Sequence, residues 1–319
     1  MTLEKCALQL LPLLSSGVPR LATELLAQLN ISHHLLQQAL GILQSWGLLL
    51  LIDSKQRHRL IVPPRLCHAT LCHYSQHSAI QLFPLLPSTN QYLLDHYQTL
   101  PSGAACVAEY QTLGRGRRGR QWLASFGSCA LFSMLWHWSK VPQGLSAISL
   151  ALSLVAADTL QQLGVEEVKV KWPNDLYLQG RKLGGVLIET SGSVANNGQI
   201  SLIIGIGLNL YPSCQRLSIK QPVISLQEAA VRLDGNQLIG SILNAWRTAL
   251  QQFSQQGLAP FLNRWPSYDL LMGKWLQLQT PGGSILAGIA RGIDPQGALL
   301  VEHQGKLERF PGGTVRAYG

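Results

Sequence analysis

The chain contains 319 residues, of which 46% are hydrophobic and 13% charged, and its net charge is +9. This length is sufficient for two or three domains, and the composition excludes an intrinsically disordered chain. No apolar run has the length and purity of a membrane span, so we expect no membrane partner. Residues 1–5 lack the basic segment and the long apolar stretch of an export signal, so we expect a cytoplasmic protein.

Residues 1–64 have the pattern of three helices followed by two strands. Apolar residues recur with helical spacing in three segments, at 8–14, 21–29 and 35–46. Ser32 can cap the start of the third helix, and Gly47 can end it. Two short strand patterns follow, at 48–53 and 58–62. Three helices followed by a hairpin are typical of a winged helix-turn-helix, which we expect for this segment.

Residues 65–80 are expected to form a connector, because Pro63-Pro64 stops the preceding strand pattern. Residue types that bind zinc gather there: Cys67, His68, Cys72, His73 and His77. The gap between the two cysteines is loose, and no second Cys/His pair follows at the spacing of a zinc finger. The pattern therefore favours a connector over a metal site.

Residues 81–270 are expected to form a large domain in which helices bury a mixed sheet. Helical patterns occur at 90–97, 145–163 and 236–256. Strand patterns occur at 105–109, 130–136, 168–172, 185–189 and 199–205. In residues 271–319, short strand patterns alternate with the turn signals at 281–283, 294–297 and 311–313, which predicts a small β-barrel of the SH3 type. The fold class is therefore multidomain α+β.

The densest positive charge lies in one loop, Gly114-Arg115-Gly116-Arg117-Arg118-Gly119-Arg120, which we call the arginine loop. Its glycines let a ligand approach the backbone closely, and its arginines present planar, charged forks to carboxylate or phosphate oxygens. Four arginines repel one another, so we expect the loop to be mobile alone and to order around an anion. A nucleic-acid patch or a solvated basic loop is the alternative interpretation.

A second group of polar residues follows a strand pattern. The run Lys171-Trp172-Pro173-Asn174-Asp175 closes that strand, and the proline predicts a turn that projects an amide and a carboxylate. Lys182 lies just before Gly184 and Gly185, where glycines allow a close ligand approach. Asp175 alone could be a turn cap and Lys182 a surface lysine. Together with the arginine loop, they indicate an anion-binding catalytic site.

Five sequence blocks occur in the order and spacing of a known family. They are Ser88-Thr89-Asn90, Glu109-Tyr110-Gln111 with the arginine loop and Trp122, the run at 171–175, Arg181-Lys182-Leu183-Gly184-Gly185, and Gly205-Ile206-Gly207-Leu208-Asn209. In these blocks the chain resembles the bacterial bifunctional biotin–protein ligases that also repress the biotin operon. The resemblance covers essentially the whole chain and is weakest at the N-terminus. It implies the class II synthetase/biotin ligase fold for residues 81–270.

The resemblance implies two half-reactions, with biotin and ATP as substrates and Mg²⁺ assisting. The carboxylate of biotin attacks the α-phosphate of ATP, which gives biotinyl-5′-adenylate and pyrophosphate. The ε-amine of a lysine on the biotin carboxyl carrier protein of acetyl-CoA carboxylase then takes the biotinyl group. The resemblance also implies operator DNA as a second partner and a homodimer when the adenylate is bound.

The resemblance assigns roles to individual residues. Biotin binding falls to Ser88, Thr89, Asn90, Gln111, Arg115, Gly116, Arg117 and Lys182. Nucleotide binding falls to Arg118, Arg120, Trp122, Asn174 and Asn209, with Asn209 reading the adenine edge. The expected catalytic residues are Lys182, Arg117 and Asp175. Asp175 either holds Mg²⁺ or orients the incoming amine, and Trp122 either shields the adenylate or is a core aromatic.

Two departures from the family pattern bear on function. Val223 stands before the segment at 224–229, where bifunctional members can carry an aromatic residue that folds over the adenine, so adenylate retention is expected to be weaker. The third helix of the N-terminal segment has no lysine or arginine at 32–38, although phosphate contacts dominate DNA affinity. The remaining DNA-binding candidates are Ser32, His33, Gln37, Lys55 and Arg57.

Three functions stay open at this point. The first is a biotin–protein ligase with an N-terminal regulatory domain that also represses transcription. The second is a related acyl ligase of the lipoate type, for which we do not expect the arginine loop and the 171–175 run together. The third is a DNA-binding repressor that uses biotinyl-adenylate only as a corepressor, which the intact Lys182 and Asp175 disfavour.

Overall fold

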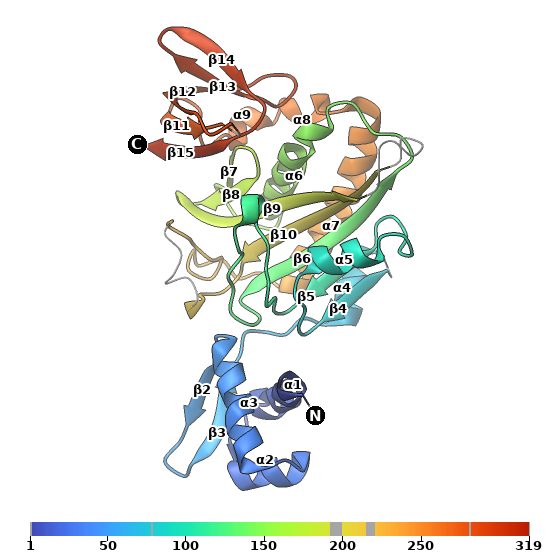
Figure 1. Ribbon diagram of the computed structural model, residues 1–319, viewed down its shortest axis with the longest axis vertical. Coiled ribbons are helices and arrows are strands. Elements are labelled where there is room, and N and C mark those ends of the chain that lie inside the picture. The colour runs from blue at the N-terminus through green and yellow to red at the C-terminus, as the bar shows by residue number, and fades with distance from the viewer. Residues whose placement is uncertain (1, 78, 192–199, 215–220, 281, 319) are drawn as a thin grey trace.

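The computed structural model describes residues 2–77, 79–191, 200–214, 221–280 and 282–318. Three bodies follow one another, with the N-terminal unit and the C-terminal sheet at opposite ends of a large central unit (Figure 1). Gln199 and Pro281, which belong to an expected strand and an expected turn, lie outside the described residues. Among the described residues, no helix combines the length and the apolar character needed to cross a bilayer.

The N-terminal unit packs three helices against a small antiparallel sheet. The helices are α1 (Leu3–Ser15), α2 (Ala22–Leu29) and α3 (His33–Ser45). The strands, in sheet order, are β1 (Arg20–Leu21), β3 (Arg57–Ile61) and β2 (Leu49–Ile52). Ser32 caps α3 as expected, because its hydroxyl accepts a hydrogen bond from the Leu35 N–H at 3.2 Å. The expected three helices and hairpin are therefore confirmed. The strand β1 was not predicted, because a strand of two residues is too short to show an alternating pattern.

The N-terminal unit shares its core with the central unit. Trp46, which follows α3, stacks on Phe126 with ring centroids 6.0 Å apart and packs against Tyr110 at 5.7 Å. The Trp46 carbonyl accepts a hydrogen bond from the Phe126 N–H at 2.7 Å. Beside this cluster, Arg65 binds the buried carboxylate of Glu109 at 2.5 Å. Because Tyr110 and Phe126 flank the arginine loop in sequence, this contact anchors both ends of the segment that carries it.

Replacing Trp46 with alanine should lower the free energy of unfolding by about 3–5 kcal/mol, the usual cost of emptying a buried tryptophan site. Trp46 is only 4% exposed, so the surrounding aromatic rings cannot collapse into the space without moving the backbone. Urea unfolding followed by circular dichroism measures the change. Trp275→Ala is the matched control, since Trp275 is 52% exposed. Equal losses in the two variants would contradict the anchoring role of Trp46.

The central unit is built on a seven-stranded mixed sheet. Its strands, in sheet order, are β4 (Ile80–Phe83), β5 (Ala105–Ala108), β6 (Cys129–Trp138), β10 (Ile200–Asn209), β9 (Arg181–Ser191), β8 (Asp175–Leu178) and β7 (Lys169–Lys171). The pair β4–β5 is parallel and the other neighbouring pairs are antiparallel. Every residue of β10 is buried, because helices pack on one face of the sheet and α5 (Thr89–His96) and Trp122 cover β10 on the other.

Strand alternation divides the core of the central unit into two layers. Ala105 and Val107 face the main core with α6 (Ile148–Gln162) and α7 (Gly235–Gln256), whereas Cys106 faces α5 (Thr89–His96) on the other side. The shorter helices are η1 (Arg117–Gly119), η2 (Leu145–Ala147), α8 (Ala259–Leu262) and α9 (Trp265–Tyr268). The expected helices at 90–97, 145–163 and 236–256 are confirmed, whereas β4 and β8 were not expected.

The expected connector contains a helix. Residues His68–Ser75 form α4, which packs on α7 and is held there by the Asn244 side chain, whose Nδ2 donates to the Tyr74 carbonyl at 2.8 Å. Residues 68–75 are mostly polar and lack a clear apolar stripe, so no helix was predicted there. The His68 ring lies 2.8 Å from the Ile80 carbonyl. The described residues contain no group of three or more His, Cys, Asp or Glu that could hold a metal ion.

The C-terminal residues form an open antiparallel sheet. Its strands, in sheet order, are β14 (Lys306–Phe310), β13 (Leu299–His303), β12 (Ile285–Ile293), β11 (Trp275–Gln279) and β15 (Thr314–Tyr318). The expected strands are present, but β14 and β15 lie at opposite edges and are not paired with each other within the described residues. The sheet is therefore not closed into a barrel, and the prediction of a barrel was wrong. Alternating strands and turns in the sequence predict hairpins, but they do not show whether the first and last strands of the sheet pair with each other. Trp172 ties this region to the central unit, since its Nε1 donates to the Gly297 carbonyl at 2.9 Å.

Candidate active site

One cavity of about 1210 Å³ lies between the central sheet and the C-terminal sheet. Its walls come from segments far apart in sequence, namely the start of α5, the arginine loop, the 171–175 run, β9, β10 and residues 313–317. All thirteen residues expected to bind biotin or the nucleotide line it, as does the expected catalytic residue Asp175: Ser88, Thr89, Asn90, Gln111, Arg115, Gly116, Arg117, Arg118, Arg120, Trp122, Asn174, Lys182 and Asn209. The fold therefore brings the sequence motifs together at one site.

The start of α5 presents a network of polar side chains to the cavity. Ser88 caps the helix, and its hydroxyl accepts from the Gln91 N–H. Thr89 donates from its backbone N–H and its hydroxyl to Gln111 Oε1, at 2.7 Å and 3.1 Å. The Ser133 hydroxyl lies 2.7 Å from Thr89 Oγ1 and 2.5 Å from Asn90 Oδ1. These buried groups are held in fixed orientations, as recognition of a small polar ligand requires.

The arginine loop folds over the cavity. Its Gly116 N–H donates to the Arg120 carbonyl at 2.7 Å, which closes the loop on itself. Three of its arginines contact polar side chains from other elements: Arg115 with Glu189, Arg117 with Asn174, and Arg118 with Thr314. Burial lowers the pKa of the Arg117 guanidinium below its usual value, and the nearby Asp175 carboxylate opposes part of that shift. Mobility of this loop stays a prediction.

Lys182 and Asp175 form an ion pair inside the cavity. Lys182 Nζ lies 2.7 Å from Asp175 Oδ1, and its side chain is 14% exposed. The Lys182 backbone is held on the other side, since its N–H donates to the Pro222 carbonyl and its carbonyl accepts from the Ile224 N–H, both at 3.0 Å. A Cβ at Gly185 would approach Asp175 Oδ1 to 2.9 Å, so a larger residue there would displace the Asp175 carboxylate from this position. The pair is thus placed by β8, β9 and the segment at 222–224 together.

Two asparagines have geometries that bear on their expected roles. Asn174 joins the arginine loop to β9, because its Oδ1 accepts from Arg117 and its Nδ2 donates to the Val186 carbonyl, both at 2.7 Å. Asn209 Nδ2 donates to the Ile224 carbonyl at 3.0 Å. The amide that we expected to read adenine is therefore already committed to the backbone. It holds the segment that carries Val223, which lines the cavity.

Trp122 forms part of the cavity wall above β10. Its ring packs directly on Gly207, where an added Cβ would lie 2.5 Å from the indole. The Lys182 ammonium lies 5.9 Å from the centre of the Trp122 ring. The indole Nε1 is buried and has no hydrogen-bond partner among the described residues. Trp122 is therefore a wall residue that faces both the sheet and the reactive ion pair.

Sequence reasoning missed three cations that also line the cavity, Lys171, Lys274 and Arg316. Burial lowers the pKa of Lys171, while the Asp175 carboxylate raises it again in part. Lys171 belongs to a motif that the sequence did single out. Lys274 directly precedes β11, Arg316 lies in β15, and neither belongs to a motif. Among the described residues that line the cavity, Asp175 is the single acidic one. The cavity is therefore strongly positive and suited to a polyanion.

The DNA-binding candidates lie on the exposed face of the N-terminal unit. His33 and Gln37 line a concavity of about 390 Å³ between α3 and the hairpin, together with His58. Lys55 is exposed in the hairpin turn. Arg57 is paired with Asp53, with Nη2 and Oδ2 2.7 Å apart. The charge of Arg57 is thus largely balanced within the protein, which leaves Lys55 as the freer cation of the two.

Comparisons with known proteins show which family this chain is similar to. The model of the biotin/lipoate A/B protein ligase family matches residues 82–209, and that of the biotin protein ligase C-terminal domain matches residues 273–316. The chain is 38% identical to the bifunctional ligase/repressor BirA of Escherichia coli over 310 residues. The aligned region covers 97% of this chain and 96% of the relative. It is 32% identical over 238 residues to the biotin–[acetyl-CoA-carboxylase] ligase of Paracoccus denitrificans, over 72% of this chain and 96% of the relative.

Among solved structures, the biotin protein ligase of Aquifex aeolicus in complex with biotin and ATP matches with a TM-score of 0.67. Its identity is 26%, over 75% of this chain and 99% of that chain. The family expected from the five sequence blocks is confirmed: the chain belongs to the biotin/lipoate A/B protein ligase family.

Proposed function

We propose that this protein is an ATP-dependent biotin–protein ligase. The observation that carries the proposal is the cavity itself, which joins a neutral polar network at α5 to a cluster of cations around the Lys182–Asp175 pair. Such a site fits a ligand with a neutral hydrogen-bonding head at one end and an acyl-phosphate anhydride at the other. The names of the relatives from Escherichia coli and Paracoccus denitrificans support the same activity.

The ureido head of biotin fits the network at α5. Ser88, Thr89, Asn90 and Gln111 offer hydroxyl and amide groups there, while apolar side chains of β9 and β10 can bury the ring and tail. Arg115, Gly116 and Arg117 cover the carboxylate end. A specific polar site of this kind rejects ligands that lack the matching groups, because its buried polar atoms would lose their partners.

The nucleotide fits the cationic end of the cavity. Arg118, Arg120 and Lys182 supply positive charge for the phosphates, and Trp122 and Val223 line the space left for the rest of the nucleotide. When the biotin carboxylate attacks the α-phosphate, negative charge develops between them and pyrophosphate leaves. The Lys182 ammonium neutralises that charge more strongly in the transition state than in the ground state, which is what accelerates the step.

Asp175 fits a Mg²⁺ site together with the substrate phosphates. Mg²⁺ is usually bound through one or two carboxylates plus phosphate oxygens, and it keeps several water ligands. One Asp175 oxygen is engaged by Lys182, so the other oxygen is the one that would hold the ion. Bound Mg²⁺ would supply further positive charge to the phosphates. Asp175 in turn holds Lys182 in position.

In the second half-reaction, the ε-amine of a carrier lysine attacks the biotinyl carbonyl and AMP leaves. The carrier is proposed to be the biotin carboxyl carrier protein of acetyl-CoA carboxylase. The test uses purified protein, ATP, labelled biotin and a carrier domain. Label on the carrier lysine is the expected result. If biotin binds but no label reaches the carrier, the protein is a biotin-dependent regulator instead. Transfer of lipoate and not biotin would favour the lipoate-type ligase.

Binding to an operator is proposed as a second function of residues 1–64. Three helices followed by a hairpin support a winged helix-turn-helix there, and the name of the Escherichia coli relative includes a repressor. His33 and Gln37 are exposed, but this unit has few free cations to contact DNA phosphates, so we expect weak DNA binding. We expect this binding to need the homodimer that the protein forms with biotinyl-adenylate. A gel shift with operator DNA, with and without biotin and ATP, tests this. No shift under either condition would leave the ligase as the single function.

We assign the remaining parts by the same reasoning. Residues 65–80 connect the DNA-binding unit to the catalytic domain at 81–270, with α4 docked on α7. Residues 271–319 are assigned to a domain of SH3-like type, whose open sheet contributes residues 313–317 to the cavity. Its place in the cavity wall supports a direct part in substrate binding.

Gly205→Ala should weaken biotin binding by roughly 10-fold or more, because it displaces a polar group of the site. An added Cβ would approach Asn90 Oδ1 to 2.1 Å, so the Asn90 amide must leave its position. Isothermal titration with biotin measures the change. Gly41→Ala is the control, since nothing lies within 4 Å of a Cβ there and Gly41 does not line the cavity. Unchanged biotin affinity in Gly205→Ala would show that Asn90 does not contact the ligand.

A further inference from the structure

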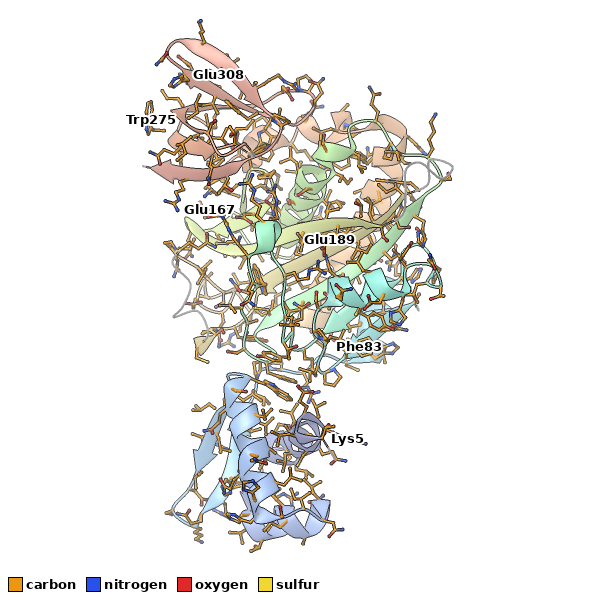
Figure 2. The ribbon with its side chains drawn as sticks, viewed as in Figure 1. Lys5, Phe83, Glu167, Glu189, Trp275 and Glu308 are labelled. Atoms are coloured by element: carbon orange, nitrogen blue, oxygen red, sulfur yellow. The ribbon has the colours of Figure 1, made fainter. Side chains whose placement is uncertain are left out.

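Glu189 connects two parts of the site from behind the cavity wall. It lies within β9, opposite Ile203 of β10, and its side chain is 21% exposed. Figure 2 labels it on the central sheet near α5. Its Oε1 pairs with Arg115 Nη2 at 2.6 Å, and its Oε2 accepts from Asn90 Nδ2 at 2.8 Å. One carboxylate therefore contacts both the arginine loop and the polar network.

The contact with Asn90 fixes the orientation of that amide. Asn90 Oδ1 lies 2.5 Å from the Ser133 hydroxyl, while Asn90 Nδ2 donates to Glu189. Turning the amide over would place its oxygen against the carboxylate and lose that hydrogen bond, whereas the Ser133 hydroxyl could accept from the turned amide nitrogen. A hydrogen bond to a charged acceptor is about twice as strong as a neutral one, so Glu189 makes the larger contribution to this orientation.

The contact with Arg115 fixes the position of the arginine loop. Arg115 also donates to Gln91 Oε1 at 2.7 Å, so its guanidinium is held between β9 and α5. The loop is closed between Gly116 and Arg120, and holding Arg115 therefore holds its neighbours. Glu189 supplies negative charge to Arg115, in a loop whose four arginines repel one another.

We propose that Glu189 is the positioning residue of this site: it docks the arginine loop through Arg115 and orients Asn90 with the same carboxylate. It touches none of the atoms expected to react. The docking of the arginine loop by Glu189 is inferred from these contacts alone. The expected effect on biotin affinity also rests on the proposed function.

Glu189→Gln removes the negative charge of the side chain while keeping its size. Glutamine keeps an oxygen that accepts from Asn90, but it removes the charge that faces Arg115. Trypsin cleaves after arginine, so cleavage within 114–120 reports how often the loop leaves its docked position. We expect Glu189→Gln to raise that cleavage rate roughly 3- to 10-fold, as loss of a partly exposed ion pair predicts. Glu189→Asp keeps the charge and should restore most of the protection.

The matched control is Glu302→Gln, which neutralises the carboxylate paired with Arg291 at 2.7 Å in the C-terminal sheet. It should leave cleavage of the loop unchanged. A double-mutant cycle adds Arg115→Gln, with cleavage counted after Arg117, Arg118 and Arg120 only. In that background Glu189→Gln should add less than about twofold. Additive effects, or no effect of Glu189→Gln alone, would overturn the proposal.

The same assay separates failure of this inference from failure of the proposed function. Biotin and ATP should protect the loop of the unaltered protein against trypsin. If they do not, the proposed ligand is wrong, although the comparison between Glu189→Gln and its control still decides the docking role. If they do, Glu189→Gln should also weaken biotin binding roughly 3- to 10-fold, and unchanged affinity together with unchanged cleavage would contradict the inference.

Discussion

Lys182→Ala should slow formation of biotinyl-adenylate by roughly 10²- to 10³-fold while weakening biotin binding far less, since loss of one preorganised electrostatic group typically costs that much. The Lys182 ammonium is 2.7 Å from Asp175 and mostly buried, so water cannot replace its charge well. Its role is to stabilise charge that develops only as the carboxylate attacks phosphorus. Single-turnover release of pyrophosphate measures the first quantity, and calorimetric titration with biotin the second.

Lys140→Ala is the control for this experiment, because Lys140 is exposed and does not line the cavity. It should leave both quantities unchanged. Losses of equal size in adenylate formation and in biotin affinity would show that Lys182 contributes uniform binding, and the catalytic role would then be wrong. Asp175 would be left without its partner in Lys182→Ala, so Lys182→Arg, which keeps the charge, should retain more activity than alanine.

Arg117→Gly should release the adenylate before transfer, so that lysines of bystander proteins become labelled. Arg117 is the loop arginine whose guanidinium is held by Asn174, at 2.7 Å, over the reactive end of the cavity. A hydrogen bond that involves a charged group contributes about 1.5–3 kcal/mol, so release should rise roughly 10- to 100-fold. Labelled biotin, ATP and serum albumin as bystander provide the measurement, with a carrier domain in a parallel reaction.

Arg117→Ala distinguishes the guanidinium from the backbone. Alanine removes the same contact with Asn174 but leaves the backbone less free than glycine does. If the guanidinium retains the adenylate, alanine should reproduce most of the bystander labelling. Labelling confined to the carrier in both variants would mean that the arginine loop does not retain the adenylate.

The local parts of the site could be predicted from the sequence because local rules place them. Ser88 and Ser32 each precede a helix and cap it, and Gly185 sits where β9 meets the cavity. The family motifs then placed Lys182, Asp175 and the arginine loop together. These features depend on residues close in sequence or on blocks whose order is shared with relatives.

The remaining parts depend on contacts between distant elements. Asn90 and Glu189 are 99 positions apart, and Arg118 and Thr314 are 196 apart. Nothing local marks Glu189 or Thr314, because each is an ordinary strand residue until the sheets assemble. The motif of Asn209 does not indicate that its Nδ2 donates to the Ile224 carbonyl, and the adenine role of Asn209 stays a prediction. The helix α4 was missed because its apolar residues have no helical spacing and it is stabilised by packing on α7.

The C-terminal wall of the cavity has a consequence for the timing of synthesis. Residues 313–317, which include the Thr314 partner of Arg118, leave the ribosome after every other part of the site. Domains fold as units during translation, so the central unit can assemble first with its cavity still open on that side. A nascent chain therefore cannot complete this site before residues 313–317 have emerged. The order of synthesis delays the enzyme until its final sheet has docked.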